Sequence, residues 1–343
     1  MSDIQYIIEQ FKALAAIDSP SGFTKAVCKY TMEELTRLGY TPVQTTKGGV
    51  TVSLGGIHKE NGLLLTGHID TLGAMVSSIK PNGRLRLSAV GGLQANNCET
   101  ENCKVYTRDG KVYTGCLQMD EPSVHVNHDY ATQPRTFDGM EVVLDILSTT
   151  KEETYKCGIA VGDYVCFDPR TTITETGFIK SRFLDDKLSV AIILGLAKHL
   201  KDNKLIPTRA LYAHITVFEE VGHGGCASVP QGVTEILGVD MGCVGGELQC
   251  SERQVSICVK DSRSPSTYEV VTDLIETAKT NNIDFAPDVY PYYGSDCDAA
   301  LSAGHDLKHC LIGSGVYASH GYERTHTDGI ANTFALLKAY TVK

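Results

Sequence analysis

The sequence predicts an α/β fold in which a mostly parallel sheet is sandwiched by helices and interrupted by an inserted all-β domain. Near both ends of the chain, apolar strand-like segments alternate with helical segments, which is typical of a sheet covered on both faces. Between them, short β-rich runs are separated by turn-rich stretches without a clear amphipathic helix. We therefore expect one discontinuous domain, residues 1–71 and 171–343, with a β-rich domain of residues 72–170 inserted into it.

The first segment of the larger domain predicts two helices and two strands. Residues 4–17 place apolar side chains at helical spacing, and Ser19-Pro-Ser-Gly22 ends this helix. A second helical pattern runs from about residue 24 to 38 and ends at a glycine. Strand-like segments follow at 49–54 and 62–66, and the second is apolar throughout, as expected of a strand covered on both faces.

The insertion and the second segment of the larger domain differ in pattern. In the insertion we expect strands in the β-rich runs 111–119, 141–146 and 163–167. Beyond residue 180 the alternation of helix and strand returns. Its expected elements are a strongly apolar helix at 188–200, a strand at 210–218, a short segment at 238–241, and helices near 267–279 and 329–340.

The composition argues against several classes of partner. The chain has 343 residues, enough for two domains, and 42% of them are hydrophobic. No apolar run reaches the roughly 18 residues of a membrane span. The net charge of −10 is spread along the chain without charged blocks, which disfavours nucleic acid and anionic membranes as partners. The N-terminus lacks a secretory pattern, so we expect a cytoplasmic protein.

Twelve cysteines raise the question of disulfides or a structural zinc site. Most of them lie singly within apolar runs, where a thiol behaves as a small buried hydrophobe. Cys98 and Cys103 form the closest pair, but no second pair completes a tetrahedral zinc site. We therefore expect reduced thiols and no catalytic cysteine.

Two adjacent glutamates, Glu219 and Glu220, follow the apolar run 210–218 and precede a glycine-rich turn. Neighbouring side chains on a strand point to opposite faces, so the two carboxylates could serve different tasks. One could bind a metal ion while the other takes a proton from a water that the metal holds. The alternative is a solvated pair of charges at an exposed strand end.

Further candidate ligands occur where other strands end or helices begin. His68 and Asp70 follow an apolar strand and share a face of an extended chain, so Asp70 suits the role of supporting a ligating His68. The alternative is a structural histidine at a strand end. Asp185 and Asp186 precede a helix, where N-capping is the alternative role. Asp240 interrupts an apolar strand pattern, which is costly unless the charge is paired or bound to a metal.

Two late histidines, His320 and His326, precede the last helix, where capping and loop hydrogen bonds are the alternative roles. Together the candidates offer two imidazoles, three carboxylates and a spare glutamate at the edge where open α/β sheets hold their ligands. Two divalent ions that share one bridging carboxylate require such a set. Nitrogen and oxygen donors indicate zinc, cobalt or manganese.

A family resemblance rests on the order of these segments: His68-Ile-Asp70, Asp185-Asp186, Glu219-Glu220-Val-Gly222, Asp240 and a late histidine, with Ser19-Pro-Ser-Gly22, Gly158-Ile-Ala-Val-Gly-Asp163 and Gly294-Ser-Asp-Cys-Asp298 in support. The chain resembles the di-metal aminopeptidases of the glutamyl and tetrahedral aminopeptidase group, within the wider clan of co-catalytic zinc exopeptidases. The likeness spans nearly the whole chain, including the β insertion. It implies an α/β fold of the zinc exopeptidase type.

The resemblance also implies which residues hold the metal. Asp185 would bridge two divalent ions per subunit, with zinc favoured over cobalt or manganese. His68 and Asp240 would complete one metal site. Glu220 and His320 would complete the other.

The same resemblance implies two further roles. Glu219 would be the general base, because two neighbouring ions lower the pKa of a shared water whose proton Glu219 can take and return to the leaving amine. Asp70 would orient His68. The metal ligands and these two residues together form the predicted active site.

The chain departs from the family pattern at two places. The family usually follows its bridging aspartate with Asn-Arg, whereas this chain has Asp186 and Lys187, which changes the charge and loses the planar donor fork of arginine. The segment Tyr317-Ala-Ser-His320 is offset by one residue from the family's spacing. His326 therefore stays an alternative to His320 as the last ligand.

The resemblance implies a metallo-aminopeptidase that removes N-terminal residues from short peptides. Family members use the insertion to form dimers and a hollow, twelve-subunit tetrahedral particle, so we expect the 72–170 domain to serve dimerisation and assembly. Two other functions stay open: a related metal-dependent deacylase or carboxypeptidase-like hydrolase, and a catalytically silent, metal-stabilised assembly protein. The intact Glu219–Glu220 pair argues against the silent protein, because a scaffold of ligands alone needs no spare base.

Overall fold

The computed structural model describes residues 1–342, which divide into two compact units. The first, here called the sheet unit, consists of Met1–Asp70 together with the chain from Arg170 onward. The second, the barrel unit, is Thr71–Pro169. These boundaries fall within one residue of the expected domain boundaries. Among the described residues, no helix has the length and apolar character needed to cross a membrane.

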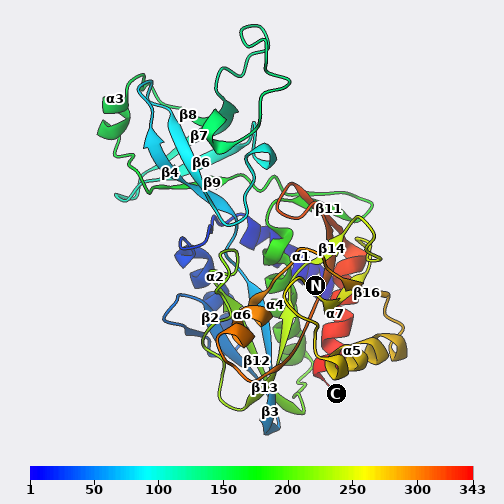
Figure 1. The fold of residues 1–343 in the computed structure, drawn as a ribbon. Coiled ribbons are helices and arrows are strands. Elements are labelled where there is room, and N and C mark those ends of the chain that lie inside the picture. The colour runs from blue at the N-terminus through cyan, green and yellow to red at the C-terminus, as the bar shows by residue number, and fades with distance from the viewer. Residues whose placement is uncertain (343) are drawn as a thin grey trace. The chain divides into compact units, whose positions relative to one another are not determined.

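The sheet unit is built on a twelve-stranded mixed sheet (Figure 1). In sheet order its strands are β1 (Val43–Gln44), β2 (Val50–Gly55), β12 (Arg209–Thr216), β3 (His58–His68), β13 (Val233–Val239), β17 (Lys308–Tyr317), β18 (Glu323–His326), β11 (Phe178–Ser181) and β10 (Thr172–Ile173); β14 (Gly242–Val244) and β15 (Val255–Lys260) pair with β17, and β16 (Phe285–Val289) pairs with β15.

Parallel and antiparallel pairs are mixed in this sheet, with parallel pairs at its centre and also between β14 and β17 and between β15 and β16, so the expectation of a mostly parallel sheet needs correction. Strands β12, β3, β13 and β17 run parallel, whereas β2, β15, β18, β11 and β10 each join a neighbour in antiparallel pairing. The reason is the length of the connections. Residues 174–177 join β10 to β11, and so short a link permits only a hairpin, because a parallel pair needs a crossover of about a dozen residues or more.

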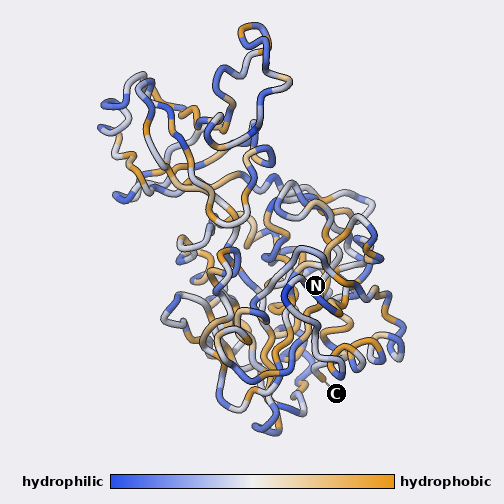
Figure 2. The backbone as a smooth tube through the Cα atoms, viewed as in Figure 1, coloured by the Kyte–Doolittle hydropathy of each residue, from blue (hydrophilic) through white to orange (hydrophobic). Residues whose placement is uncertain are grey.

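Helices cover both faces of this sheet, but unequally. On β3, Leu63 and Leu65 belong to the main apolar core, whereas Leu64 faces a smaller cluster, because successive side chains of a strand alternate. The smaller cluster packs against α6 (Asp296–Ser302) through Cys297 and Ala300. The main core is covered by α1 (Asp3–Ala15), α2 (Lys25–Arg37), α4 (Leu184–Asp202), α5 (Tyr268–Thr280) and α7 (Thr327–Thr341). Figure 2 shows hydrophobic residues gathered in the central strands.

Helix α4 lies at the centre of the main core and is buried around most of its circumference, as expected of a helix that is apolar on nearly all sides. Gly195 lets α1 approach it closely, since a Cβ at this position would lie 2.5 Å from Ile7 Cγ1. The backbone of Asp185 and Asp186 is not helical, so the regular helix begins only after these two residues.

The barrel unit is a closed barrel of antiparallel strands, which agrees with the expected all-β insertion. In order around the barrel the strands are β4 (Gly73–Ile79), β5 (Leu85–Val90), β8 (Met140–Leu144), β7 (Val112–Met119), β6 (Asn102–Tyr106) and β9 (Tyr164–Phe167). The barrel unit also contains a short helix that the sequence pattern does not predict, α3 (Lys151–Lys156), which begins with a capping box of Thr150 and Glu153. Closure leaves the barrel without the exposed strand edges that promote aggregation.

Candidate metal centre

The predicted ligands gather at one edge of the sheet because β12, β3 and β13 are parallel neighbours whose carboxyl ends meet there. His68 is the last residue of β3, and Asp240 directly follows β13. Glu219 and Glu220 follow β12, Asp185 lies at the start of α4, and His320 lies between β17 and β18. All of these residues belong to the sheet unit.

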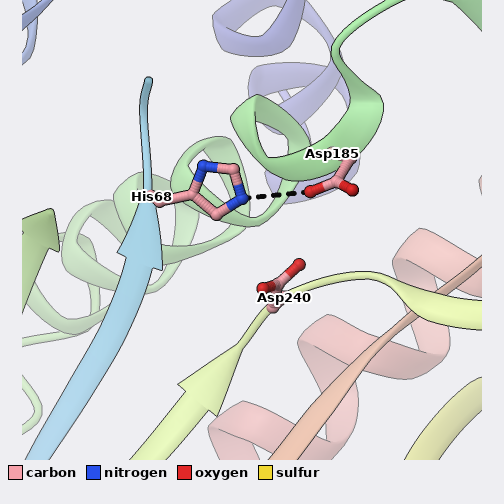
Figure 3. Close-up of side chains that lie close together, drawn as sticks. All are labelled: His68, Asp185 and Asp240. Atoms are coloured by element: carbon pink, nitrogen blue, oxygen red, sulfur yellow. Dashed lines mark hydrogen bonds and ion pairs between the residues drawn. The ribbon is translucent and has the colours of Figure 1, made fainter. Parts of the chain in front are cut away.

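The first group of possible ligands is His68, Asp185 and Asp240, which are all buried (Figure 3). Each residue offers one ligand atom, and these atoms lie within 4.8 Å of one another. His68 Nε2 is 3.0 Å from Asp185 Oδ1. The group therefore offers one imidazole nitrogen and two carboxylates to a single ion.

The second group is Asp185, Glu220 and His320, whose ligand atoms also lie within 4.8 Å of one another. His320 Nε2 is 3.6 Å from Asp185 Oδ2 and 3.6 Å from Glu220 Oε2. Asp185 thus belongs to both groups, with Oδ1 toward His68 and Oδ2 toward His320. This is the placement that a bridging carboxylate needs.

Asp70 supports the site through its backbone as well as its side chain. His68 Nδ1 lies 2.9 Å from the carbonyl oxygen of Asp70 and 3.6 Å from its carboxylate, so the carbonyl is the nearer partner. This contact leaves Nε2 facing Asp185. The carboxylate of Asp70 accepts instead from the backbone N–H of Glu219, at 3.2 Å, and from the hydroxyl of Ser21. Asp70 therefore links the candidate ligand His68, the glutamate turn and the early Ser19–Gly22 turn.

The two glutamates do not lie on a strand, so strand alternation does not explain their different positions. β12 ends at Thr216, and Phe218 adopts a left-handed backbone with φ +69°. Glu219 and Glu220 lie in the turn that follows, and Lys47 Nζ holds this turn by donating to the carbonyls of His223 and Gly224. Glu219 Oε2 lies 3.7 Å from His68 Nε2.

Burial dominates the electrostatics of the site. It raises the pKa of Glu219 and Glu220 well above the ordinary value, and neighbouring carboxylates add to the rise. Burial and the charge of Asp185 raise the pKa of Asp240 to about 7. Burial also opposes ionisation of Asp185, but its hydrogen bonds to His68 and Ser319 and the charges of His68 and His320 together outweigh burial, so the pKa of Asp185 is lowered. Buried carboxylates that repel one another are costly unless cations neutralise them, and this donor set therefore fits divalent ions.

His326, the alternative last ligand, lies outside both groups. Its Nε2 lies 2.8 Å from the carbonyl oxygen of Thr176, and its Nδ1 accepts from the backbone N–H of Asp328 at the start of α7. Both ring nitrogens are therefore engaged in structural hydrogen bonds. Of the two late histidines, the structure brings only His320 to the site.

Asp186 and Lys187, which depart from the family pattern, are buried and hold nearby backbone. Asp186 Oδ2 accepts from the backbone N–H of His68 at 3.1 Å, and Lys187 Nζ donates to the carbonyl of Ile17 at 2.6 Å. Neither residue belongs to the two candidate ligand groups.

Sequence reasoning gave no role to two buried acids, Glu323 and Asp296, which lie beside the site. Glu323 accepts from the backbone of Asp185 and His320, and Asp296 accepts from the Thr216 hydroxyl at the end of β12. Both are charged residues in polar segments, so their burial is invisible in the sequence. The only signal was their place in segments already singled out, Gly294–Asp298 and the stretch between the two late histidines.

A cavity of about 700 Å³ opens beside the two groups. The candidate ligands Asp185, Glu220, Asp240 and His320 line it together with Glu219. Its remaining wall includes Arg263, Tyr292, Ser295, Asp298 and Cys226. The volume is in the range of sites that bind small molecules or short peptides.

Two acid–imidazole groups that share a carboxylate, beside a cavity at the edge of an α/β sheet, are the arrangement expected of a metal-dependent hydrolase. Comparison with known proteins agrees with this class. Residues 48–336 match the M42 glutamyl aminopeptidase family, and the chain belongs to that family and is a peptide hydrolase.

Two curated relatives support the assignment. The Bacillus subtilis (strain 168) protein YhfE, an aminopeptidase by name, is 42% identical over 340 residues, which cover 99% of this chain and 98% of YhfE. The glutamyl aminopeptidase of Lactococcus lactis (subsp. cremoris, strain MG1363) is 29% identical over 224 residues, 64% of this chain and 61% of the relative.

Solved structures share the fold at low identity. The aminopeptidase APDkam598 of Desulfurococcus kamchatkensis matches with a TM-score of 0.86 and 22% identity, over 99% of this chain and 95% of that chain. The TET1 peptidase of Pyrococcus horikoshii matches with a TM-score of 0.85 and 21% identity, over 98% and 99% of the two chains. Both similarities extend over the sheet unit and the barrel unit.

Proposed function

We propose that the chain is a di-metal aminopeptidase that removes N-terminal residues from short peptides, with Glu219 as the general base. The observation that carries the proposal is the placement of Asp185, whose two oxygens face two different histidines in two ligand groups. Glu219 stands beside this pair without belonging to either group. The two groups thus supply the ligands that the proposal needs and leave Glu219 as an additional carboxylate.

Each residue of the site has its own role in the proposed reaction. His68 and Asp240 would hold one divalent ion, Glu220 and His320 would hold the other, and Asp185 would contribute to both sites. When bound, two such ions lower the pKa of a water and polarise a peptide carbonyl. Glu219 takes a proton from the attacking water and later gives it to the leaving amine.

This role suits the surroundings of Glu219. Burial raises its pKa, which brings a carboxylate closer to the proton affinity that a general base needs near neutral pH. The hydrogen bond between the Asp70 carboxylate and the Glu219 backbone N–H holds the turn against the end of β3. Carboxylates around the cavity also suit the free α-amino group of a peptide, which would confine cleavage to the N-terminus.

The decisive experiment compares Glu219→Gln with Glu220→Gln. Both variants replace a partly buried carboxylate in the same turn by its isosteric amide, so they share any general effect on folding. Glu219→Gln should lower kcat on aminoacyl-nitroanilides about 100- to 10,000-fold while the metal content stays near two ions per chain. Glu220→Gln should lose both activity and one equivalent of metal, because it removes a ligand.

Retained turnover in Glu219→Gln would refute its role as base. Loss of metal from that variant would make it a ligand instead. Comparison of free with N-acetylated peptides tests the deacylase alternative, since an aminopeptidase should cleave only the free peptide. A chain that cleaves neither kind with zinc, cobalt or manganese would be the silent assembly protein.

We also propose that the barrel unit serves dimerisation and assembly into a tetrahedral dodecamer. The Pyrococcus horikoshii TET1 peptidase, which shares the fold, can assemble into a tetrahedron or a large octahedral shell. Entry to a hollow particle would restrict the substrates to short or unfolded peptides. In the part of the chain that the structure describes, none of the twelve cysteines forms a disulfide.

A further inference from the structure

One buried carboxylate connects two of the segments that carry the candidate ligands. Glu323 is the first residue of β18 and is 2% exposed. Its Oε2 accepts from the backbone N–H of Asp185 at 3.2 Å, and its Oε1 accepts from the backbone N–H of His320 at 3.3 Å. Asp185 lies at the start of α4 and His320 in the loop before β18, so this side chain fixes two distant parts of the chain together.

The two backbone N–H groups that Glu323 binds belong to Asp185 and His320, whose backbones lie outside regular secondary structure. His320 has φ +63°, in the left-handed region that residues other than glycine seldom adopt. Such a conformation persists only when the surroundings hold it in place. Asp185 is not helical although it lies at the start of α4, so its N–H takes no place in the helical hydrogen-bond ladder. The carboxylate of Glu323 accepts a hydrogen bond from both of these backbone N–H groups.

The side chains of Asp185 and His320 start from these two backbone positions, and their ligand atoms must lie close together to hold one ion. Asp185 Oδ2 and Glu220 Oε2 each lie 3.6 Å from His320 Nε2. A relaxation of the His320 loop would move the imidazole away from both carboxylates. Residues behind the direct ligands commonly set metal affinity in this way, because they orient the ligands before the ion arrives.

We propose that Glu323 is a positioning residue for the group formed by Asp185, Glu220 and His320. Its two oxygens set the separation of the Asp185 and His320 backbones, and so the geometry in which an ion is held. This inference rests on the proposed two-metal function. It assigns Glu323 no contact with the ion or the substrate.

The test uses Glu323→Gln, Glu323→Asp and a matched control, Asp288→Asn. The amide in Glu323→Gln keeps one acceptor oxygen for two N–H groups, and the shorter side chain in Glu323→Asp cannot span both. Asp288 makes the same kind of contact elsewhere in the sheet unit: it is 4% exposed, and its two oxygens accept from the backbone N–H groups of Gln249 and Cys250 at 2.8 and 2.9 Å.

The measurement is a zinc-binding isotherm for each full-length protein, by competition with a chromophoric chelator, beside its melting temperature. Glu323→Gln should weaken one of the two zinc sites about 10- to 100-fold, the usual effect of losing a supporting residue. The zinc affinity of Glu323→Asp should lie between those of Glu323→Gln and the wild type. Asp288→Asn should lower the melting temperature but leave both zinc affinities unchanged. At saturating zinc, Glu323→Gln should recover most of its kcat.

Zinc affinities in both Glu323 variants within twofold of the wild type would overturn the inference. An equal loss of affinity in Asp288→Asn would also overturn it, because the effect would then be general destabilisation. If the wild type binds two ions but cleaves no peptide, the proposed function fails while the affinity comparison still decides the role of Glu323. If the wild type binds no divalent ion, both proposals fail.

Discussion

Gly224 lies in the turn that carries Glu219, and the surrounding atoms leave no room there for a side chain. A Cβ at this position would lie 2.3 Å from Asp296 Oδ1 and 3.0 Å from the backbone nitrogen of Glu219. Ordinary van der Waals contact begins near 3.4 Å. Asp296 cannot retreat easily, because it is 4% exposed and its other oxygen accepts from Thr216. In Gly224→Ala we therefore expect the turn itself to move.

The size of the effect follows from the contact distances. The gap between 2.3 and 3.4 Å requires a shift of about 1 Å, which the backbone of Glu219 must share. A misplacement of about 1 Å in a catalytic group can cost about 100-fold in rate. Overpacking of this kind also costs about 1–3 kcal/mol of folding free energy. Gly224→Ala should therefore lose about two orders of magnitude in kcat yet remain folded.

The assay is steady-state hydrolysis of an aminoacyl-nitroanilide at saturating metal, with the metal content measured on the same sample. Gly139→Ala is the control, because a Cβ there meets no atom closer than 3.6 Å. This control should keep its kcat and its melting temperature. A kcat for Gly224→Ala within threefold of the wild type would refute the claim that the turn positions Glu219.

Two further predictions concern stability and assembly. Burial lowers the pKa of His214 to about 4, whereas an unfolded histidine has a pKa of about 6.5, so the unfolded state binds more protons between these values. The free energy of unfolding should fall by about 3 kcal/mol as the pH drops from 6.5 to 4. In urea titrations, His214→Gln should reduce the change of this free energy with pH. An unchanged pH dependence in that variant would contradict the argument. Light scattering of the metal-loaded protein should show an oligomer larger than a dimer, and a monomer would rule out the proposed assembly.

Much of the fold could be predicted because local pattern and tertiary environment agree. The apolar run Leu63–Leu65 predicts a strand covered on both faces, and its side chains do pack into cores on both sides of the sheet. The strongly apolar segment 188–200 reads as a buried helix for the same reason and lies within α4. The residues that gather at the site were predicted because strand ends and helix starts can be recognised locally.

Other features depend on distant contacts and could not be predicted. Strand β17 contains Gly313 and Gly315, and glycines so close together in the sequence suggest a loop and not a strand. A Cβ at Gly313 would lie 1.4 Å from the carbonyl oxygen of Asp240, and one at Gly315 would lie 2.1 Å from that of Ser251. These glycines therefore serve a close approach of backbones, which the sequence cannot reveal. The same holds for Glu323, whose two partners lie 138 and three positions away.

The chain leaves the sheet unit directly after Asp70, whose carbonyl contacts His68, and returns at Arg170. Every residue assigned here to metal binding, proton transfer or support of the site lies outside the segment between these two points. An insertion at this junction can thus be lengthened, replaced or reshaped without altering one ligand. If the barrel unit serves assembly as proposed, chemistry and assembly occupy separate segments of the chain, and the barrel unit could change without a change in the site. For protein engineering, the peptide after Asp70 is the natural place to exchange one barrel for another.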